Sequence, residues 1–376
     1  MTRVLVAGAG PVGLSAALAL ARRGVPVTVL EQGDGLAEQS RASTFHPPTL
    51  EMLQRLGVLK PLLDKGIVAS TFQYRERGGD AIATLDLGVL AEDTAFPFRV
   101  QCEQSKLTPI LLDALASEAD VRFGHRVRGV RADDDGVVVS SSRGELRADW
   151  LIGADGAHSV VRASLAAPFD GSTYPERFLV ASVDEELATV LSDIAPINYI
   201  FDPAEWLVLL RTPDHWRVLL PTAANTRDED EIRRLPQRLT AIADIGRPWR
   251  IRHAALYRVH QRVTERFRIG RVLLAGDAAH VNNPLGGLGM NSGIHDAVAL
   301  SEALADVVHG GPEAALDEVA ERRRRIAVDH VQAASHANYN RLRGDVGEFR
   351  RQVRALAADP AAARAHLRRA CLLDSL

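Results

Sequence analysis

Three glycines near the N-terminus have the spacing of a loop that binds a dinucleotide. Gly8, Gly10 and Gly13 lie between a short apolar run, residues 3–7, and a helical stretch, residues 14–23. In such a loop the first glycine permits a tight turn, the second lets a pyrophosphate approach the backbone, and the third lets the helix pack closely on the strand. The free amides at the start of the helix then bind phosphate.

The residues around this loop fit the same chemistry. Pro11 suits the first helical position, where a missing N–H group costs nothing, and Val12 completes the loop. Glu31, followed by Gln32, ends the next predicted strand, where its carboxylate can accept hydrogen bonds from ribose hydroxyl groups. An acid here repels a 2′-phosphate, so we expect the ADP half of FAD or NAD. A structural turn with Glu31 as an ordinary acid stays open as the alternative.

Two later segments carry an Asp beside a Gly where an apolar strand ends. Residues 151–162 read Leu-Ile-Gly-Ala-Asp-Gly-Ala-His-Ser-Val-Val-Arg, and residues 273–293 contain Gly-Asp and the run Pro-Leu-Gly-Gly-Leu-Gly-Met-Asn. With these motifs in this order, the chain resembles the single-component (group A) FAD-dependent aromatic hydroxylases, the p-hydroxybenzoate hydroxylase-like family, over about residues 1–310. The resemblance implies FAD as the cofactor and NAD(P)H as the co-substrate.

The resemblance also implies FAD-binding residues beyond the first loop. Asp277, after Gly276, is expected to bind a ribityl hydroxyl, although an N-cap role stays open. Asp155 and Gly156 are expected to contribute to FAD and NAD(P)H binding, with an Asx-type turn as the alternative for Asp155. Arg41 and Gln104 are expected to contact the FAD phosphate and ribityl chain, or else are ordinary solvated residues. Further expected contacts near the flavin ring are Gly286, Gly289, Met290 and Asn291.

The catalytic cycle that the resemblance implies is carried by the flavin. NAD(P)H reduces FAD, O2 forms a C4a-hydroperoxyflavin, and one oxygen atom passes to an aromatic, phenolic ring in a site that must exclude water. Tyr199, Arg211 and Pro284 are the predicted catalytic residues: Tyr199 to activate the phenol, Arg211 to bind a substrate carboxylate, and Pro284 to bring the backbone close to the flavin. A core role for Tyr199 stays open. A reductase or dehydrogenase of the same fold, or a non-catalytic flavin-binding protein, remains the alternative.

The elements that must position these residues predict an α/β fold. We expect a Rossmann-like FAD-binding domain of the GR2 type, interrupted by a β-sheet-rich substrate domain and followed by C-terminal helices. Residues 105–117 and 290–308 are predicted helices, and residues 206–210 and 216–220 are predicted strands of an antiparallel sheet. The predicted domains are 1–70, 101–171 and 263–310 for FAD, 71–100 and 172–262 for the substrate, and 311–376 for the helical tail.

Composition excludes several other classes. The chain has 376 residues, a net charge of −3 and 46% apolar residues, which argues against a nucleic-acid binder and against long disorder. Two cysteines are too few for a disulfide framework or a thiolate metal site, and no metal is expected. No apolar run is long enough for a membrane span, and the N-terminus has no signal pattern, so we expect a cytoplasmic protein. The helical tail is expected to cover the core or to pair subunits in a homodimer.

Overall fold

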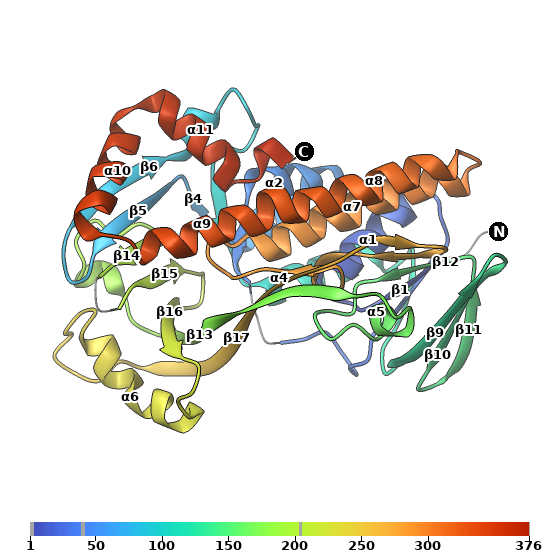
Figure 1. The fold of residues 1–376 in the computed structure, drawn as a ribbon, viewed down its shortest axis with the longest axis horizontal. Helices are drawn as coiled ribbons and strands as arrows, with labels where there is room; N and C mark the ends of the chain where they lie inside the picture. Colours follow the sequence, from blue (N-terminus) through green and yellow to red (C-terminus); the bar gives the residue numbers. More distant parts are fainter. Residues whose placement is uncertain (1–3, 39–41, 203–204, 376) are drawn as a thin grey trace.

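The first of two large sheets is parallel except at one edge. The computed structural model describes residues 4–38, 42–202 and 205–375 (Figure 1). The strand order is β18 (Arg268–Ile269), β19 (Val272–Leu274), β12 (Trp150–Gly153), β1 (Val4–Ala7), β2 (Val27–Leu30) and β8 (Asp120–Arg122). Only β18 pairs antiparallel. Every residue of β1, β2, β12 and β19 is buried, as expected for parallel strands covered on both faces.

Helices from three parts of the chain accompany this sheet. The predicted helices over 14–23, 105–117 and 290–308 are α1 (Pro11–Arg22), α4 (Gln104–Leu115) and α7 (Leu288–Val308), and α1 contacts both others. Since β1, α1 and β2 follow one another and the two strands pair in parallel, the predicted strand–helix–strand unit is confirmed. Shorter elements beside it are α2 (Pro47–Arg55), α3 (Leu59–Lys65), α5 (Val160–Ser164) and the sheet β3 (Thr44–Phe45), β7 (Arg99–Gln101), β4 (Ile67–Ala69).

The second large sheet joins the two predicted stretches of chain and adds the short strand His280–Val281 at its edge. Its order is β20 (His280–Val281), β17 (Ile251–Thr264), β13 (Phe169–Val183), β16 (Trp216–Ala223), β15 (Leu207–Arg211), β14 (Ile197–Phe201), β5 (Thr71–Glu76) and β6 (Ala81–Asp86). The expectation of a purely antiparallel sheet is wrong at one place, because β14 and β5 pair in parallel. No hairpin links these two strands, so no turn sets their relative direction.

The tail after α7 is helical, as expected. After α7 the chain forms α8 (Glu313–Ile326), the π-helical turn Ala327–Gln332 and α9 (Ala333–Leu342). The last two helices, α10 (Val346–Ala358) and α11 (Pro360–Ala370), pack at the β5–β6 edge of the second sheet (Figure 1). Their apolar residues share a buried cluster with the second sheet, including Tyr339, Phe349 and Leu367. The tail therefore covers the core.

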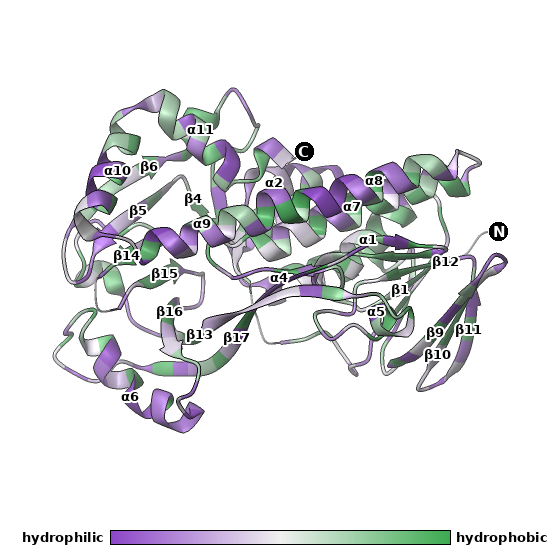
Figure 2. Cartoon of the chain, in the orientation of Figure 1, coloured by the Kyte–Doolittle hydropathy of each residue, from purple (hydrophilic) through white to green (hydrophobic). Residues whose placement is uncertain are grey.

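Hydropathy separates the interior from the outer elements. Figure 2 shows hydrophobic strands around β1 and β12, whereas the hairpin sheet of β9 (Val127–Asp133), β10 (Gly136–Ser141) and β11 (Gly144–Ala148) carries many hydrophilic residues. α6 (Asp228–Thr240) also has a hydrophilic outer side (Figure 2). In the described part of the chain, no helix has both the length and the apolar character needed to cross a membrane.

Candidate cofactor and substrate site

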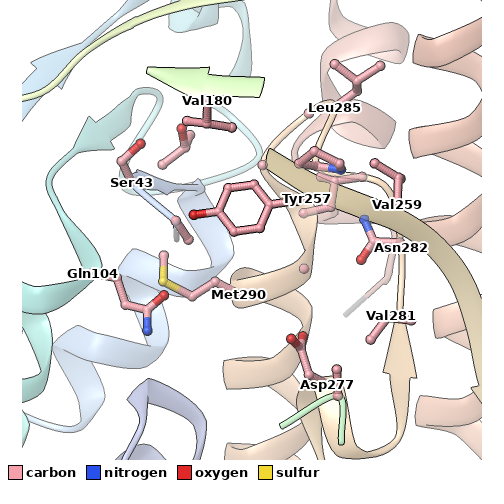
Figure 3. Close-up of a pocket in the computed structure, with 18 of the residues that line it drawn as sticks. Ser43, Gln104, Val180, Tyr257, Val259, Asp277, Val281, Asn282, Leu285 and Met290 are labelled. Carbon is pink, nitrogen blue, oxygen red and sulfur yellow. The ribbon is translucent and has the colours of Figure 1, made fainter. Parts of the chain in front are cut away.

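A large cavity lies between the two sheets. Its volume is about 1140 Å³, and its lining residues come from the first glycine loop, the 277 turn, the start of α7 and the second sheet. Pockets for small ligands usually measure about 300–1,000 Å³. The cavity is therefore large enough to hold part of a dinucleotide together with a smaller molecule. Figure 3 shows Asp277 and Gln104 towards one end, Val180 towards the other and Tyr257 reaching in from β17.

The first glycine loop lies at one end of this cavity. A Cβ atom on Gly13 would sit 1.9 Å from the Gly8 carbonyl oxygen, and one on Gly8 would sit 2.5 Å from the Ala154 oxygen. These two glycines therefore permit the close packing of α1, β1 and β12. A Cβ on Gly10 would meet nothing within 4 Å, so the space in front of Gly10 is open. Gly10, Pro11 and Val12 line the cavity.

Glu31 has structural partners in the loop. Its carboxylate accepts hydrogen bonds from the backbone N–H groups of Ala9, at 2.8 Å, and Gly33, at 2.9 Å. Neither Glu31 nor the exposed Gln32 lines the cavity. The ribose role of Glu31 and Gln32 stays a prediction, and the bond to Ala9 shows that Glu31 also supports the turn.

The Gly-Asp motif forms a 3₁₀ turn, Gly276–Ala278, directly after β19. Asp277 is exposed and lines the cavity. Asp277 lies inside this turn, whose N-cap position is Ala275. A Cβ on Gly276 would lie 2.9 Å from Val12 Cγ2, so this glycine lets the turn approach α1.

A buried ionic cluster holds the 277 turn, and sequence reasoning missed it. The Asp296 carboxylate, on α7, accepts hydrogen bonds from the Gly276 N–H at 3.2 Å and the Arg323 Nε at 2.8 Å, and it contacts His280 Nε2 at 2.8 Å. Burial acts to raise the pKa of Asp296, but Arg323 and His280 lower it below its usual value. The carboxylate is therefore ionised, and it ties the turn to α7 and α8. No local signal in the sequence sets Asp296 apart, because α7 also carries Glu302 and Asp306.

The glycine-rich segment brings backbone to the cavity at the start of α7. Gly287 precedes the helix with φ of +68°, and no side chain caps the first turn. Pro284, Gly286, Gly289 and Met290 all line the cavity. The unpaired amides of a first helical turn carry partial positive charge, so a negatively charged group bound beside residues 287–290 is stabilised.

Asn291 supports this segment from inside the core rather than from the cavity wall. Its side-chain oxygen accepts hydrogen bonds from the His46 N–H at 2.9 Å and the Thr49 hydroxyl at 2.7 Å. Its amide donates to the carbonyl oxygens of Thr44 and Gly287. Asn291 is fully buried and does not line the cavity. It thus joins the start of α7 to residues 44–49, and a direct contact with a cofactor stays a prediction.

The two residues of the central Asp-Gly motif, Asp155 and Gly156, have different roles. The Asp155 carboxylate accepts hydrogen bonds from the N–H groups of Val160, at 2.7 Å, and Val161, at 3.1 Å, so it holds the start of α5. These bonds reach five and six residues along the chain and so differ from an Asx-type turn. Gly156 lines the cavity and Asp155 does not. Arg162 donates to the Ala278 oxygen at 2.8 Å and thereby links this motif to the 277 turn. Gln104, at the start of α4, lines the cavity, whereas Arg41 lies outside the described residues.

One face of the second sheet forms the other wall of the cavity. On β14, β15 and β16 alternate residues line it, as the period of two in a β-strand requires, whereas on β17 the consecutive residues 257–260 do. We call this set the cavity face: Phe178, Val180, Ile197, Tyr199, Val208, Leu210, Arg217, Leu219, Tyr257 and Val259. Arg211 follows Leu210 and so points to the opposite face, where it lies 3.4 Å from Glu186. The prediction that Arg211 binds the substrate is therefore not supported by its position.

Buried polar groups interrupt this mainly apolar wall. Tyr199 is 8% exposed and packs on Tyr74 and Phe72. Burial raises the pKa of Tyr199, and the nearby positive charge of Arg99 opposes the rise. Arg99, on β7, and Arg217 are 2% and 8% exposed and line the same cavity. Sequence reasoning missed both arginines, because neither belongs to a motif.

The comparisons with known proteins agree with this arrangement. A family model described as "FAD binding domain" matches residues 1–334. The chain belongs to the FAD-dependent aromatic hydroxylases. Para-nitrophenol 4-monooxygenase of Pseudomonas sp. (strain WBC-3) is 36% identical to this hydroxylase over 349 residues, which cover 89% of this chain and 86% of the relative.

Two solved structures extend the similarity to the whole fold. The crystal structure of p-nitrophenol 4-monooxygenase from Pseudomonas putida DLL-E4 matches with a TM-score of 0.92 and 33% identity, covering 98% of this chain and 97% of the other. Aklavinone-11 hydroxylase, solved with FAD and aklavinone, matches with a TM-score of 0.81 and 29% identity, covering 95% and 70%. The hydroxylase is thus an FAD-dependent, NAD(P)H-using monooxygenase of aromatic substrates.

The cavity fits FAD at the end built from the three motifs. We call this the cofactor end: Gly10 to Val12, Gln104, Gly156, Asp277 and residues 286–290. The open space before Gly10 suits a pyrophosphate, the exposed Asp277 suits a sugar hydroxyl, and the first turn of α7 suits the ring edge that becomes negative on reduction. Among the described residues no cluster of three or more metal-ligating side chains is found.

Proposed function

We propose that this monooxygenase hydroxylates a small phenol that lies against the cavity face. The observation that supports the proposal is the meeting of the cofactor end and the cavity face in one cavity, with the Tyr199 hydroxyl and the buried Arg99 and Arg217 in a mainly apolar wall. Similar enzymes act on nitrophenol and pentachlorophenol by their names. These are single-ring phenols, and the cavity face offers flat apolar contacts for one ring.

Bound FAD supplies electron transfer from NAD(P)H and activation of O2. The chain holds the aromatic ring between Val180, Val208 and Leu219, whose side chains keep water away from the reacting atoms. The amides at the start of α7 stabilise negative charge beside residues 287–290. Pro284 lines the cavity next to this segment, so its role is to shape the backbone there.

Tyr199 acts as a hydrogen-bond donor to the phenol oxygen. Its pKa is raised by burial, so it keeps its proton at neutral pH and is a poor base. The positive charge of Arg99 acts on Tyr199, and an arginine can only donate hydrogen bonds, so Arg99 does not compete for the Tyr199 proton. The hydroxyl proton is then available to a substrate oxygen.

Turnover assays with phenols test this function. FAD-loaded enzyme is mixed with NADH or NADPH and a series of monocyclic phenols, and cofactor oxidation, O2 uptake and product are measured. We expect phenol-stimulated O2 uptake with one hydroxylated product per NAD(P)H. Oxidation that continues without O2 would instead indicate a reductase or dehydrogenase, and the absence of turnover would indicate a non-catalytic flavin-binding protein.

Three further expectations concern the domain boundaries, the oligomeric state and the location of the protein. We keep the domain division at residues 71–100 and 172–262 as a proposal, although β13 and β17 extend beyond these boundaries. A homodimer and a cytoplasmic location also remain proposals. The supply of NAD(P)H supports the location, and the masses of the complexes in solution would test the dimer.

A further inference from the structure

The carbonyl groups of the glycine-rich segment, residues 283–290, are all bound by protein donors in its first part. Each carbonyl oxygen from residue 283 to residue 287 accepts one hydrogen bond, and four of the five donors are side chains. The donors, in the order of the carbonyl groups, are Asn282 Nδ2 at 2.7 Å, the Gly287 N–H at 3.0 Å, Asn338 Nδ2 at 3.4 Å, His46 Nε2 at 2.9 Å and Asn291 Nδ2 at 2.6 Å. The protein therefore fixes the direction of each of these carbonyl groups.

This arrangement turns N–H groups towards the cavity. Every peptide bond among the described residues is trans, and a trans peptide points its N–H and C=O groups in opposite directions. The Leu285 and Gly287 carbonyl groups are held by Asn338 and Asn291, so the N–H groups of Gly286 and Leu288 point the other way. Gly286 and Leu288 both line the cavity, and Figure 3 shows Leu285 and Met290 beside it. The segment thus offers hydrogen-bond donors to a ligand.

The peptide between Gly286 and Gly287 is the part of the segment that can most easily rotate. The φ angles of Gly286 and Gly287 are +107° and +68°, in a region that glycine enters at little cost. Two neighbouring glycines place no Cβ atom against rotation of the peptide between them. Half a turn would exchange its C=O and N–H groups and direct a carbonyl oxygen at the ring edge that becomes negative on reduction. A bond from outside the segment is needed to prevent this rotation.

His46 supplies that bond from the interior. It is fully buried directly before α2 and does not line the cavity. Burial and the charge of Arg99 hold the pKa of His46 well below its usual value, so the imidazole is neutral and has one N–H group. Because a carbonyl oxygen can only accept, the hydrogen is on Nε2, which lies 2.9 Å from the Gly286 oxygen.

The other ring nitrogen of His46 shows what this bond costs. In the described part of the chain, Nδ1 of His46 is buried without a hydrogen-bond partner. A buried unpaired nitrogen is unfavourable, and an apolar side chain at position 46 would avoid it. The histidine is therefore better explained by the bond that it makes to the Gly286 carbonyl than by packing.

We propose that His46 is a positioning residue for FAD: its Nε2–H group locks the Gly286–Gly287 peptide, so that the segment keeps N–H groups towards the flavin ring and favours the reduced, negatively charged cofactor. His46 acts through the backbone and touches neither the cofactor nor the substrate. The inference goes beyond the proposed function, because it holds whichever aromatic compound is the substrate.

The test measures the reduction potential of bound FAD without a phenol. FAD-loaded enzyme is reduced stepwise under anaerobic conditions in equilibrium with a reference dye, and the spectra of flavin and dye are followed. His46→Leu should make the potential more negative by about 30 mV, which corresponds to a tenfold loss of preference for reduced over oxidised FAD in a two-electron couple. The dissociation constant of oxidised FAD should change less than about threefold, since the oxidised ring carries no negative charge.

Two further variants separate the hydrogen bond from packing. His46→Gln keeps an N–H donor of similar reach, so it should restore the preference for reduced FAD to within about threefold of the wild type. Leu53→Ala removes a fully buried apolar side chain of α2 and should destabilise the same region while leaving the potential unchanged.

A third variant tests the segment even if His46→Leu fails to fold. Asn338→Ala removes the donor to the Leu285 carbonyl from α9, where Asn338 is only partly buried, and should shift the potential in the same direction by about threefold in the FAD preference.

Three results would overturn the inference. They are a His46→Leu potential equal to that of the wild type, a His46→Gln shift as large as that of His46→Leu, and an equal shift in Leu53→Ala. Should His46→Leu not fold, an unchanged potential in Asn338→Ala would overturn it instead. None of these measurements contains a phenol, so their failure is distinct from a failure of the proposed function.

Discussion

The two ends of the cavity are built in different ways. The cofactor end is mainly backbone: glycines at 10, 156, 286 and 289 and the first turns of α1 and α7 line it, with Asp277 as its acidic side chain. The opposite end is mainly side chains, which project from one face of a twisted, mostly antiparallel sheet. Backbone geometry leaves glycine motifs in the sequence, whereas side-chain contacts on a sheet leave only a pattern of alternation. The cofactor can therefore be recognised from sequence, and the substrate cannot.

The largest expected effect lies beneath the cofactor end. Arg323→Met removes the partner of the buried Asp296 carboxylate, and breaking a buried pair costs about 3–5 kcal/mol. The free energy of unfolding, measured by denaturant titration of the FAD-loaded protein, should fall by that amount. Arg324→Met is the matched control, because Arg324 pairs with Glu321 near the surface of the same helix and should cost less than about 1 kcal/mol.

The same cluster gives a pH dependence. The pKa of Asp296 is below its usual value in the folded protein, so its contribution to stability is complete above the ordinary Asp pKa of about 3.9 and is lost as the pH falls through the folded value. The stability difference between wild type and Asp296→Asn should stay constant from about pH 7 to 5 and shrink only below about pH 4. A difference that shrinks near pH 6 would contradict the ionised cluster.

Two glycines of one loop separate folding from cofactor binding. Gly13→Ala places a methyl group 1.9 Å from the Gly8 oxygen, so it should lower the free energy of unfolding by about 1–3 kcal/mol or more. Gly10→Ala meets no protein atom within 4 Å and should leave the stability of the FAD-free protein unchanged. It should nevertheless weaken FAD binding, measured by fluorescence titration. Equal effects of the two changes on both measurements would remove the distinction.

Substitutions of Asp277 and Tyr199 test whether the cofactor end binds FAD and the cavity face acts on the phenol. Asp277→Ala should raise the FAD dissociation constant about 10- to 150-fold, because a hydrogen bond to a charged group contributes about 1.5–3 kcal/mol. Tyr199→Phe should leave FAD affinity unchanged and lower kcat/KM for a phenol about 5- to 30-fold. Since the pKa of Tyr199 is raised, that loss should stay constant from about pH 7 to 9. A Tyr199→Phe enzyme with weaker FAD binding would contradict the division.

The smallest effects compare two neighbours on β15. Leu210 lines the cavity and Arg211 does not. Leu210→Ala should raise KM for a phenol about 3- to 10-fold through lost apolar contact, whereas Arg211→Ala should change it less than about twofold. A larger effect of Arg211→Ala would show that Arg211, and not Leu210, points into the cavity.

The glycine loops that line the cofactor end could be located from the sequence, for physical reasons. Gly8 and Gly13 are required by close approaches of the backbone, and Gly10 leaves open the space that a pyrophosphate would use; such requirements recur at fixed spacings. The face on which Arg211 lies could not be predicted, because a shift of one residue moves a strand side chain to the other face and nothing local in the sequence sets that register. Arg99 and Asp296 were out of reach, because their roles depend on partners more than 20 residues away, such as Cys371 and Arg323. The parallel pairing of β14 with β5 likewise depends on distant contacts.

Oxygen labelling tests the central claim most directly, because it asks whether the two ends act on one reaction. The FAD-loaded wild type is supplied with NAD(P)H, 4-nitrophenol and ¹⁸O₂, and the aromatic product is analysed by mass spectrometry. The account predicts one ¹⁸O atom in each hydroxylated product, with NAD(P)H consumption that depends on the phenol. An unlabelled product, or consumption that is the same with and without the phenol, would contradict it.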